Sequence, residues 1–161
     1  LLDTGAPWYE VYETKDGGYF AIGAIETKFY AVLADKIGLS EEDRKRQYDV
    51  KHWPALRDKF TAIFKTKTRD EWSAILEGTD ACATPVLSIE EAPNHPHMAA
   101  RKTFAARDGV VQPQSAPRFA KAGAPDLVGP QSTGAQTRDV LALAGYNAAE
   151  IDAMLAGGVA I

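Results

Sequence analysis

The chain of 161 residues is 45% hydrophobic and 25% charged, and its formal net charge at pH 7 is −4. This composition is typical of a soluble globular protein and suffices for one domain with a sizeable core. The sequence has neither the roughly 20-residue apolar run that spans a bilayer nor the clustered basic face of a nucleic-acid-binding protein, so we expect no membrane span and no nucleic acid. The single cysteine, Cys82, excludes an intrachain disulfide and fits a reducing compartment, which favours a cytoplasmic location.

The first predicted element is a β-hairpin. Residues 9–14 alternate apolar and polar side chains, which is the period of a half-buried strand. The turn at 15–18 contains Asp16 followed by Gly17, a pair typical of tight hairpins. The return strand, 19–25, is almost continuously apolar, so we expect it to be buried on both faces.

Helices are predicted in the next part of the chain. Apolar side chains recur at three- and four-residue spacing over 29–37 and 53–64, which indicates two amphipathic helices. Ser40 opens a short charged helix between them, and a capping box at 68–71 begins another helix that ends at Gly78. The expected core consists of Tyr9, Val11, Ile22, Phe29, Leu33, Trp53, Leu56, Phe60, Phe64, Trp72 and Leu76.

The second half of the chain is predicted to be less regular. An extended segment at 85–87 precedes a turn of helix opened by Ser88, and a second hairpin spans 103–112. Residues 113–134 are rich in proline and glycine and form a long irregular arm. The arm leads into two short helices within 138–156.

These elements predict an α+β fold. We expect a small domain of β-hairpins and antiparallel sheet packed by amphipathic helices, and an extended C-terminal arm that ends in short helices. Residues 1–8 are assigned to an interdomain linker, 9–112 to a small domain, and 113–161 to the arm and its helices. The arm is expected to pack poorly on the small domain.

Glu26 is the main candidate for chemistry, because it ends an apolar strand and immediately precedes a helix. An acid in such a position can take part in proton transfer. It can equally be an exposed carboxylate that interacts favourably with the helix dipole. The residues alone leave both interpretations open.

The other candidate groups have simpler structural explanations. His95 and His97 are fewer than the three or four ligands of a zinc site, so we expect no metal. Nothing nearby in the sequence supplies a histidine to activate Cys82 as a nucleophile. Asp80 has the position of a turn or capping residue, and the sequence contains no phosphate-binding glycine loop.

Two sequence blocks carry a resemblance to a known family. The run VYETKDGGYFAIGAIETKFY at 11–30, and GTDACATPVL at 78–87 followed by Glu90 and Glu91, resemble the α-methylacyl-CoA racemases of the family III CoA-transferase superfamily. The rest of the chain also fits this family, at His95, His97, Arg101, Gly145, Tyr146, Glu150 and Ile151.

The resemblance implies that the chain is the C-terminal part of a longer enzyme. Members have a large N-terminal domain, a small domain and a tail that returns to the large domain. This chain resembles the small domain and the tail, with 113–161 packing on the absent large domain. Members form interlocked homodimers, in which the active site lies between the large domain of one subunit and the small domain of the other. The fragment alone is therefore expected to be inactive.

The implied reaction is inversion of the α-carbon of a 2-methylacyl-CoA thioester through an enolate. The family's catalytic set is a histidine and an aspartate of the large domain and the glutamate of a Gly-Ala-Ile-Glu motif, which is Glu26 here. Asp80 and Tyr30 are candidate supporting residues. CoA enters as part of the substrate, no other cofactor is expected, and most of the CoA-binding surface should lie outside this chain.

Two alternatives to the racemase remain. One is a family III CoA-transferase, which typically has an uncharged polar residue or a glycine-rich loop where this chain has Glu26. The other is a non-catalytic interaction module with the same small-domain fold.

Overall fold

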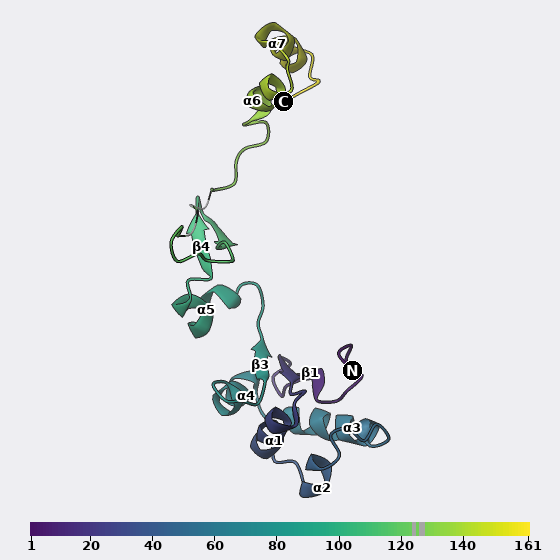
Figure 1. Cartoon of the computed structure of the whole chain (residues 1–161). Coiled ribbons are helices and arrows are strands. Elements are labelled where there is room, and N and C mark those ends of the chain that lie inside the picture. Colours follow the sequence, from purple (N-terminus) through teal and green to yellow (C-terminus); the bar gives the residue numbers. More distant parts are fainter. Residues whose placement is uncertain (124, 126–127) are drawn as a thin grey trace. The chain divides into compact units, whose positions relative to one another are not determined.

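The computed structural model describes residues 1–123, 125 and 128–161, and it divides into two compact units, Leu1–Ala92 and Pro93–Ile161. Both units contain helices and antiparallel strands, which confirms the α+β class (Figure 1). The division lies earlier in the chain than the predicted boundary between 112 and 113.

The first unit is built on a three-stranded antiparallel sheet with the strand order β1-β2-β3. β1 (Tyr9–Glu13) and β2 (Tyr19–Gly23) form the predicted hairpin, which is therefore confirmed. Gly17 has a φ of +80° in the turn, a conformation that favours glycine. β3 (Ala83–Val86), which the sequence indicated only as a short extended segment, pairs with the other edge of β2.

The helices of the first unit follow the predicted boundaries closely. They are α1 (Thr27–Lys36), α2 (Glu41–Arg44), α3 (Trp53–Phe64) and α4 (Arg69–Leu76). Thr68 and Glu71 form the predicted capping box at the start of α4, with both reciprocal hydrogen bonds present. Gly38 and Gly78 follow α1 and α4 with φ of +75° and +72°, as expected for glycines that end helices.

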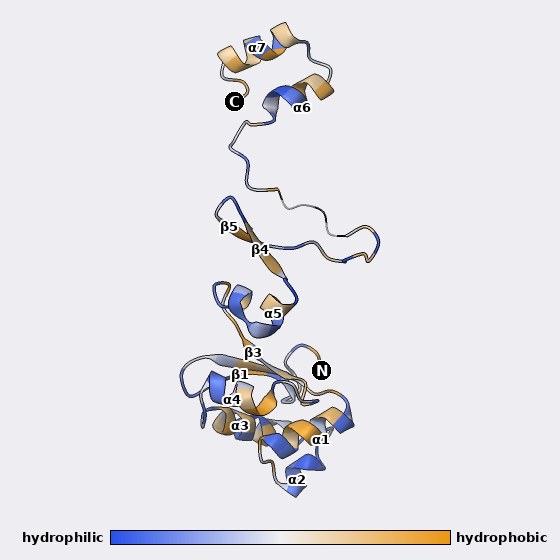
Figure 2. Ribbon diagram, turned by 90° about the vertical axis from the view of Figure 1, so that its left-hand side faces the viewer, coloured by the Kyte–Doolittle hydropathy of each residue, from blue (hydrophilic) through white to orange (hydrophobic). Residues whose placement is uncertain are grey.

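The core lies between one face of the sheet and the helices, and Figure 2 shows α1, α3 and α4 on the same side of the strands. Tyr12 of β1 stacks on Phe60 and Phe64 of α3, with ring centroids 5.5 and 5.4 Å apart. Phe64 also lies 6.0 Å from the ring of Phe20 in β2 and 5.1 Å from that of Trp72 in α4. Each aromatic pair of this kind is worth about 0.5–1.5 kcal/mol beyond its burial, so Phe64 links the sheet to two helices.

The inward face of the sheet differs from the prediction. Val11, expected in the core, is 46% exposed, and the buried ring of β1 belongs to Tyr12. In β2, Phe20 and Ile22 are buried whereas Tyr19 is 49% exposed, so this strand is buried on one face only. Both predictions were wrong because the helices cover a single face and successive side chains alternate between faces. The other expected core residues are buried or partly buried.

The segment before β1 packs into the first unit. Residues 6–8, at the end of the segment predicted as a linker, are buried. Trp8 lies edge-to-face against Trp53 of α3, with ring centroids 6.0 Å apart. Arg57 of α3 donates a hydrogen bond to the backbone carbonyl of Thr4 at 2.6 Å. The first unit therefore includes this segment as well as the strands and helices.

The second unit contains a hairpin and short helices. The predicted hairpin is confirmed as β4 (Phe104–Arg107) and β5 (Val110–Pro113), with positive φ at Asp108 and Gly109 in its turn. The helical segments are η1 (Ala92–Asn94), which begins at the junction of the units, α5 (Pro96–Ala100), α6 (Thr137–Leu143) and α7 (Ala148–Ala156). None of the helices within 1–123, 125 and 128–161 is long and apolar enough to cross a membrane.

Replacing Phe60 with alanine should lower the free energy of unfolding by about 3–5 kcal/mol, because it removes a buried ring and leaves a cavity. Val11→Ala, on the open face of the sheet, should lower it by less than about 1 kcal/mol. Chemical denaturation followed by tryptophan fluorescence measures both values. Equal destabilisation by the two substitutions would mean that β1 presents the opposite face to the helices.

Candidate active site

Glu26 lies at the N-cap of α1, in the short connection between β2 and that helix. Its backbone is extended, with φ −71° and ψ 137°, and its carbonyl accepts hydrogen bonds from the amides of Phe29 and Tyr30, both at 2.9 Å. The side chain is exposed and makes no capping hydrogen bond. The positive end of the helix dipole favours a carboxylate here, and the carboxylate itself remains accessible from solvent.

Backbone hydrogen bonds hold the strand end that leads to Glu26. The Gly23 amide donates to the carbonyl of Cys82 at 2.8 Å, which extends the pairing of β2 with the β3 side of the sheet. The Ala24 amide donates to the carbonyl of Trp8 at 3.1 Å. The chain is therefore fixed on both sides immediately before it turns into α1.

Two further residues hold the same strand end through their side chains, and the sequence analysis missed both. Gln47 Nε2 donates to the carbonyls of Ala24 and Ile25 at 3.1 and 2.8 Å. The Tyr48 hydroxyl donates to the Ile25 carbonyl at 2.5 Å. The sequence gives little indication of this role, because Gln47 and Tyr48 are simply a polar and an aromatic residue after the charged run 41–46.

The negative charges of Glu26 and Asp80 both act on the thiol of Cys82. Asp80 and Cys82 are exposed, and Cys82 has a φ of +49° in the connection from α4 to β3. Partial desolvation, followed by the negative charges of Glu26 and Asp80, raises the pKa of the Cys82 thiol. A raised pKa leaves less thiolate at neutral pH, which agrees with the expectation that Cys82 is not a nucleophile.

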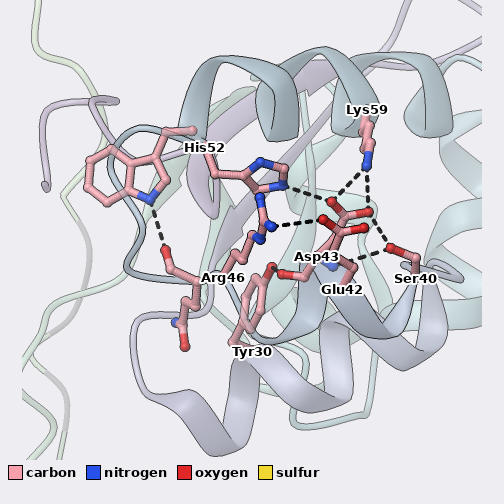
Figure 3. A network of polar contacts seen from close by, with 9 residues as sticks. Tyr30, Ser40, Glu42, Asp43, Arg46, His52 and Lys59 are labelled. Carbon is pink, nitrogen blue, oxygen red and sulfur yellow. Dashed lines mark hydrogen bonds and ion pairs between the residues drawn. The ribbon is translucent and has the colours of Figure 1, made fainter.

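Tyr30 lies on the inward face of α1. Its side chain is buried, and its hydroxyl donates a hydrogen bond to the backbone carbonyl of Asp43 at 3.2 Å (Figure 3). Burial and the charge of Asp43 raise the pKa of Tyr30 to about 12, so the hydroxyl stays protonated at neutral pH. Tyr30 connects α1 to α2 through this hydrogen bond.

Figure 3 shows a second acid, Asp43, at the centre of a polar cluster that we call the Asp43 cluster: Ser40, Asp43, His52 and Lys59. The Asp43 side chain is 3% exposed. Its carboxylate accepts hydrogen bonds from Lys59 Nζ at 2.7 Å and from the Ser40 hydroxyl at 2.6 Å, and it lies 2.8 Å from His52 Nε2. The cluster fastens α2 to α3, and the sequence had indicated only its Ser40 cap.

The environment of Asp43 keeps it ionised. Burial raises the pKa of the carboxyl, but the hydrogen bonds from Lys59, Ser40 and His52 outweigh burial and lower the pKa to about 2. A carboxylate with this pKa stays deprotonated near neutral pH and is a weak base. Asp43 is therefore a structural acid, in contrast to the exposed Glu26.

The open face of the sheet forms a shallow groove of about 290 Å³. Tyr9, Val11, Gly23 and Cys82 contribute to its mostly apolar lining, which suits an aliphatic group better than a charged one. Gly23 and Cys82 also belong to the strand end before Glu26. Among the described residues, no group of three or more His, Cys, Asp and Glu side chains is placed to hold a metal ion.

Comparison with known proteins identifies the family. Residues 2–136 match the model of CoA-transferase family III. The chain belongs to this family. It is 42% identical over 154 residues to an α-methylacyl-CoA racemase of Mus musculus, and 38% identical over 153 residues to an α-methylacyl-CoA racemase of Homo sapiens. Both matches cover 94% of this chain, which spans 40% of the length of each relative.

Two solved structures share the fold. A CaiB/BaiF family protein from Brucella suis matches with a TM-score of 0.58 and 22% identity, over 77% of this chain and 34% of that one. The orthorhombic form of Rv3272 from M. tuberculosis matches with a TM-score of 0.59 and 19% identity, over 77% of this chain and 38% of that one. At these identities the likeness concerns the fold alone. The match to the family model and the identity to the two racemases confirm the family relationship that the sequence blocks predicted.

The Asp43 cluster makes stability depend on pH in the acid range. The pKa of Asp43 is about 2 in the folded chain and 3.8 in its unperturbed form, so the unfolded state takes up the proton first as the pH falls. The resulting stabilisation, about 2 kcal/mol, should be complete above about pH 5 and lost as the pH falls toward 2. Urea denaturation at a series of pH values measures it.

The matched control for this pH dependence is Asp43→Asn. This variant should be less stable at pH 7, because Lys59 and His52 lose their charged partner. Between pH 5 and 2 it should also lack the loss of stability that protonation of Asp43 causes in the wild type. An identical acid dependence in the two proteins would contradict the assignment.

Proposed function

We propose that the protein containing this chain is an α-methylacyl-CoA racemase, which inverts the α-carbon of 2-methylacyl-CoA thioesters. The observation that carries the proposal is the 42% identity to a racemase over 94% of the chain. The exposed carboxylate of Glu26, at the end of the Gly-Ala-Ile-Glu run, supports it. In this proposal the chain supplies one acid of the site, and a large domain outside the chain supplies a histidine and an aspartate.

The proposed reaction moves one proton off the α-carbon and another onto its opposite face. A base of the large domain removes the α-proton, and the electron pair of the C–H bond moves into the thioester to form an enolate. The histidine and the aspartate serve the two faces, and CoA stays attached throughout as part of the substrate. Glu26 accepts a hydrogen bond from the histidine, fixes its tautomer and stabilises its protonated form. Positioned acid and base groups of this kind contribute about 10²–10⁴-fold.

Several features of the chain fit this role for Glu26. The carboxylate is exposed and is not used to cap α1, so a group from another domain can reach it. The apolar groove that includes Gly23 offers a surface for the acyl chain. Asp80 adds negative charge nearby, and Tyr30 anchors α1 from within the core. We propose that no cofactor is needed beyond the CoA of the substrate.

The assembly belongs to the same proposal. The large domain would meet the small domain of a second subunit in an interlocked homodimer, in the cytoplasm, and residues 113–161 would pack on a large domain. A chain without that domain would have Glu26 but no base, and should show no racemase activity.

A family III CoA-transferase is the second candidate, because the matching family model carries that description. Such a transferase would use an aspartate of the large domain as its nucleophile and would not need a carboxylate at the end of the Gly-Ala-Ile-Glu run. The presence of Glu26 therefore favours the racemase.

Glu26→Gln in the complete protein should lower kcat for epimerisation of a 2-methylacyl-CoA by about 10²-fold or more. KM should change little, because the amide keeps the shape of the side chain and Glu26 acts through the histidine. Glu41→Gln, a change at another exposed acid next to a helix N-terminus, is the control and should leave turnover unchanged. Chiral separation of the products measures the rate, and unchanged turnover in Glu26→Gln would contradict the proposal.

A further inference from the structure

We propose that Gln47 is a positioning residue for Glu26, a role that rests on the proposed function. Gln47 is remote from the strand end in sequence, and its side chain is almost completely buried, with 3% exposed. Its amide nitrogen donates to the carbonyls of Ala24 and Ile25, the two residues that precede Glu26. No charged group takes part in this contact, so its direct consequence is geometric.

The orientation of the Gln47 amide follows from its neighbours. Both atoms that face it are carbonyl oxygens, which accept hydrogen bonds and cannot donate them, so the NH₂ end must point toward the strand end. The side-chain oxygen Oε1 points elsewhere and, among the described residues, is buried without a hydrogen-bond partner. The two N–H groups of the amide are therefore the part of the side chain that holds the strand end.

Gln47 is itself held rigidly. Its backbone carbonyl accepts hydrogen bonds from the indole nitrogens of Trp8 and Trp53, both at 2.8 Å. The ring of Tyr48, the next residue, lies edge-to-face on Trp8 with centroids 5.4 Å apart. The amide that holds the strand end is thus anchored to the segment before β1 and to α3.

The Ile25 carbonyl is the point at which these contacts act on Glu26. The carbonyl oxygen of Ile25 and the backbone nitrogen and Cα of Glu26 belong to one planar peptide unit. Hydrogen bonds from Gln47 and Tyr48 to that oxygen, at 2.8 and 2.5 Å, therefore fix the plane from which the Glu26 side chain departs. Since the Glu26 side chain makes no capping hydrogen bond of its own, its direction depends on this plane.

The first test is Gln47→Met in the complete protein, which keeps the length and volume of the side chain and removes both donors. A displacement of a catalytic group by about 1 Å can cost about 10²-fold in rate, so kcat for epimerisation should fall at least about 10-fold. KM should change less than about two-fold, because Gln47 would not contact the substrate. Thr68→Ala, which removes the capping box of α4, is the matched control. It should lose stability but keep kcat.

The second test separates positioning from a purely structural role. The Glu26→Gln variant lacks the carboxylate that Gln47 is proposed to position. Adding Gln47→Met to this variant should therefore lower kcat no further. Tyr48→Phe removes only the hydroxyl that donates to the Ile25 carbonyl. Tyr48 is 54% exposed, so the substitution leaves no buried cavity. This variant should fold and lose several-fold in kcat even if Gln47→Met does not fold.

The outcomes distinguish this inference from the proposed function. A loss of kcat in Glu26→Gln, with wild-type kcat in Tyr48→Phe and in folded Gln47→Met, would overturn the positioning role and leave the proposed function intact. Independent, multiplicative effects of Glu26→Gln and Gln47→Met would also overturn it. Wild-type turnover in Glu26→Gln would instead overturn the proposed function and this inference with it.

Discussion

The geometry of the first unit depends on the hydrogen bonds around the buried residue Gln47. Its backbone carbonyl accepts the indole N–H groups of Trp8 and Trp53, while its side-chain amide holds the carbonyls at the end of β2. A single residue thereby joins the segment before β1, the strand that leads to Glu26 and the helix α3. Loss of this arrangement would leave several largely buried polar groups without partners, at about 1–3 kcal/mol each.

The first unit also illustrates how environment separates the roles of two acids. Asp43 is buried and fully engaged by Lys59, Ser40 and His52, and its pKa is about 2. Perturbed acids often mark functional sites, but structural ion-pair networks perturb them too, and the contacts of Asp43 are of this second kind. Glu26 is exposed and makes no cap bond, although it lies at a helix N-terminus. In the proposed function, its accessibility and the hydrogen-bonded backbone before it would allow it to meet a group from another domain.

Local chemistry made much of the fold predictable from the sequence. Asp16 with Gly17 determined the first hairpin, and the Thr68 capping box determined the start of α4, because both signals act within a few residues. The sequence could not show that Val11 faces outward, since that depends on which face the helices cover. Glu26 was singled out through the family motif, and its catalytic role stays a prediction. Gln47 and the Asp43 cluster were not, because bonds such as that from Trp8 to Gln47 join residues 39 positions apart.

The most direct test of the racemase account is deuterium exchange at the α-carbon. The complete protein would be incubated in deuterated water with one epimer of a 2-methylacyl-CoA and an excess of an unrelated carboxylic acid, and the thioesters analysed by mass spectrometry and chiral separation. We expect one deuterium at the α-carbon, appearance of the opposite epimer, and no CoA transfer to the added acid. Transfer of CoA to that acid, without deuterium at the α-carbon, would contradict the account and identify a transferase.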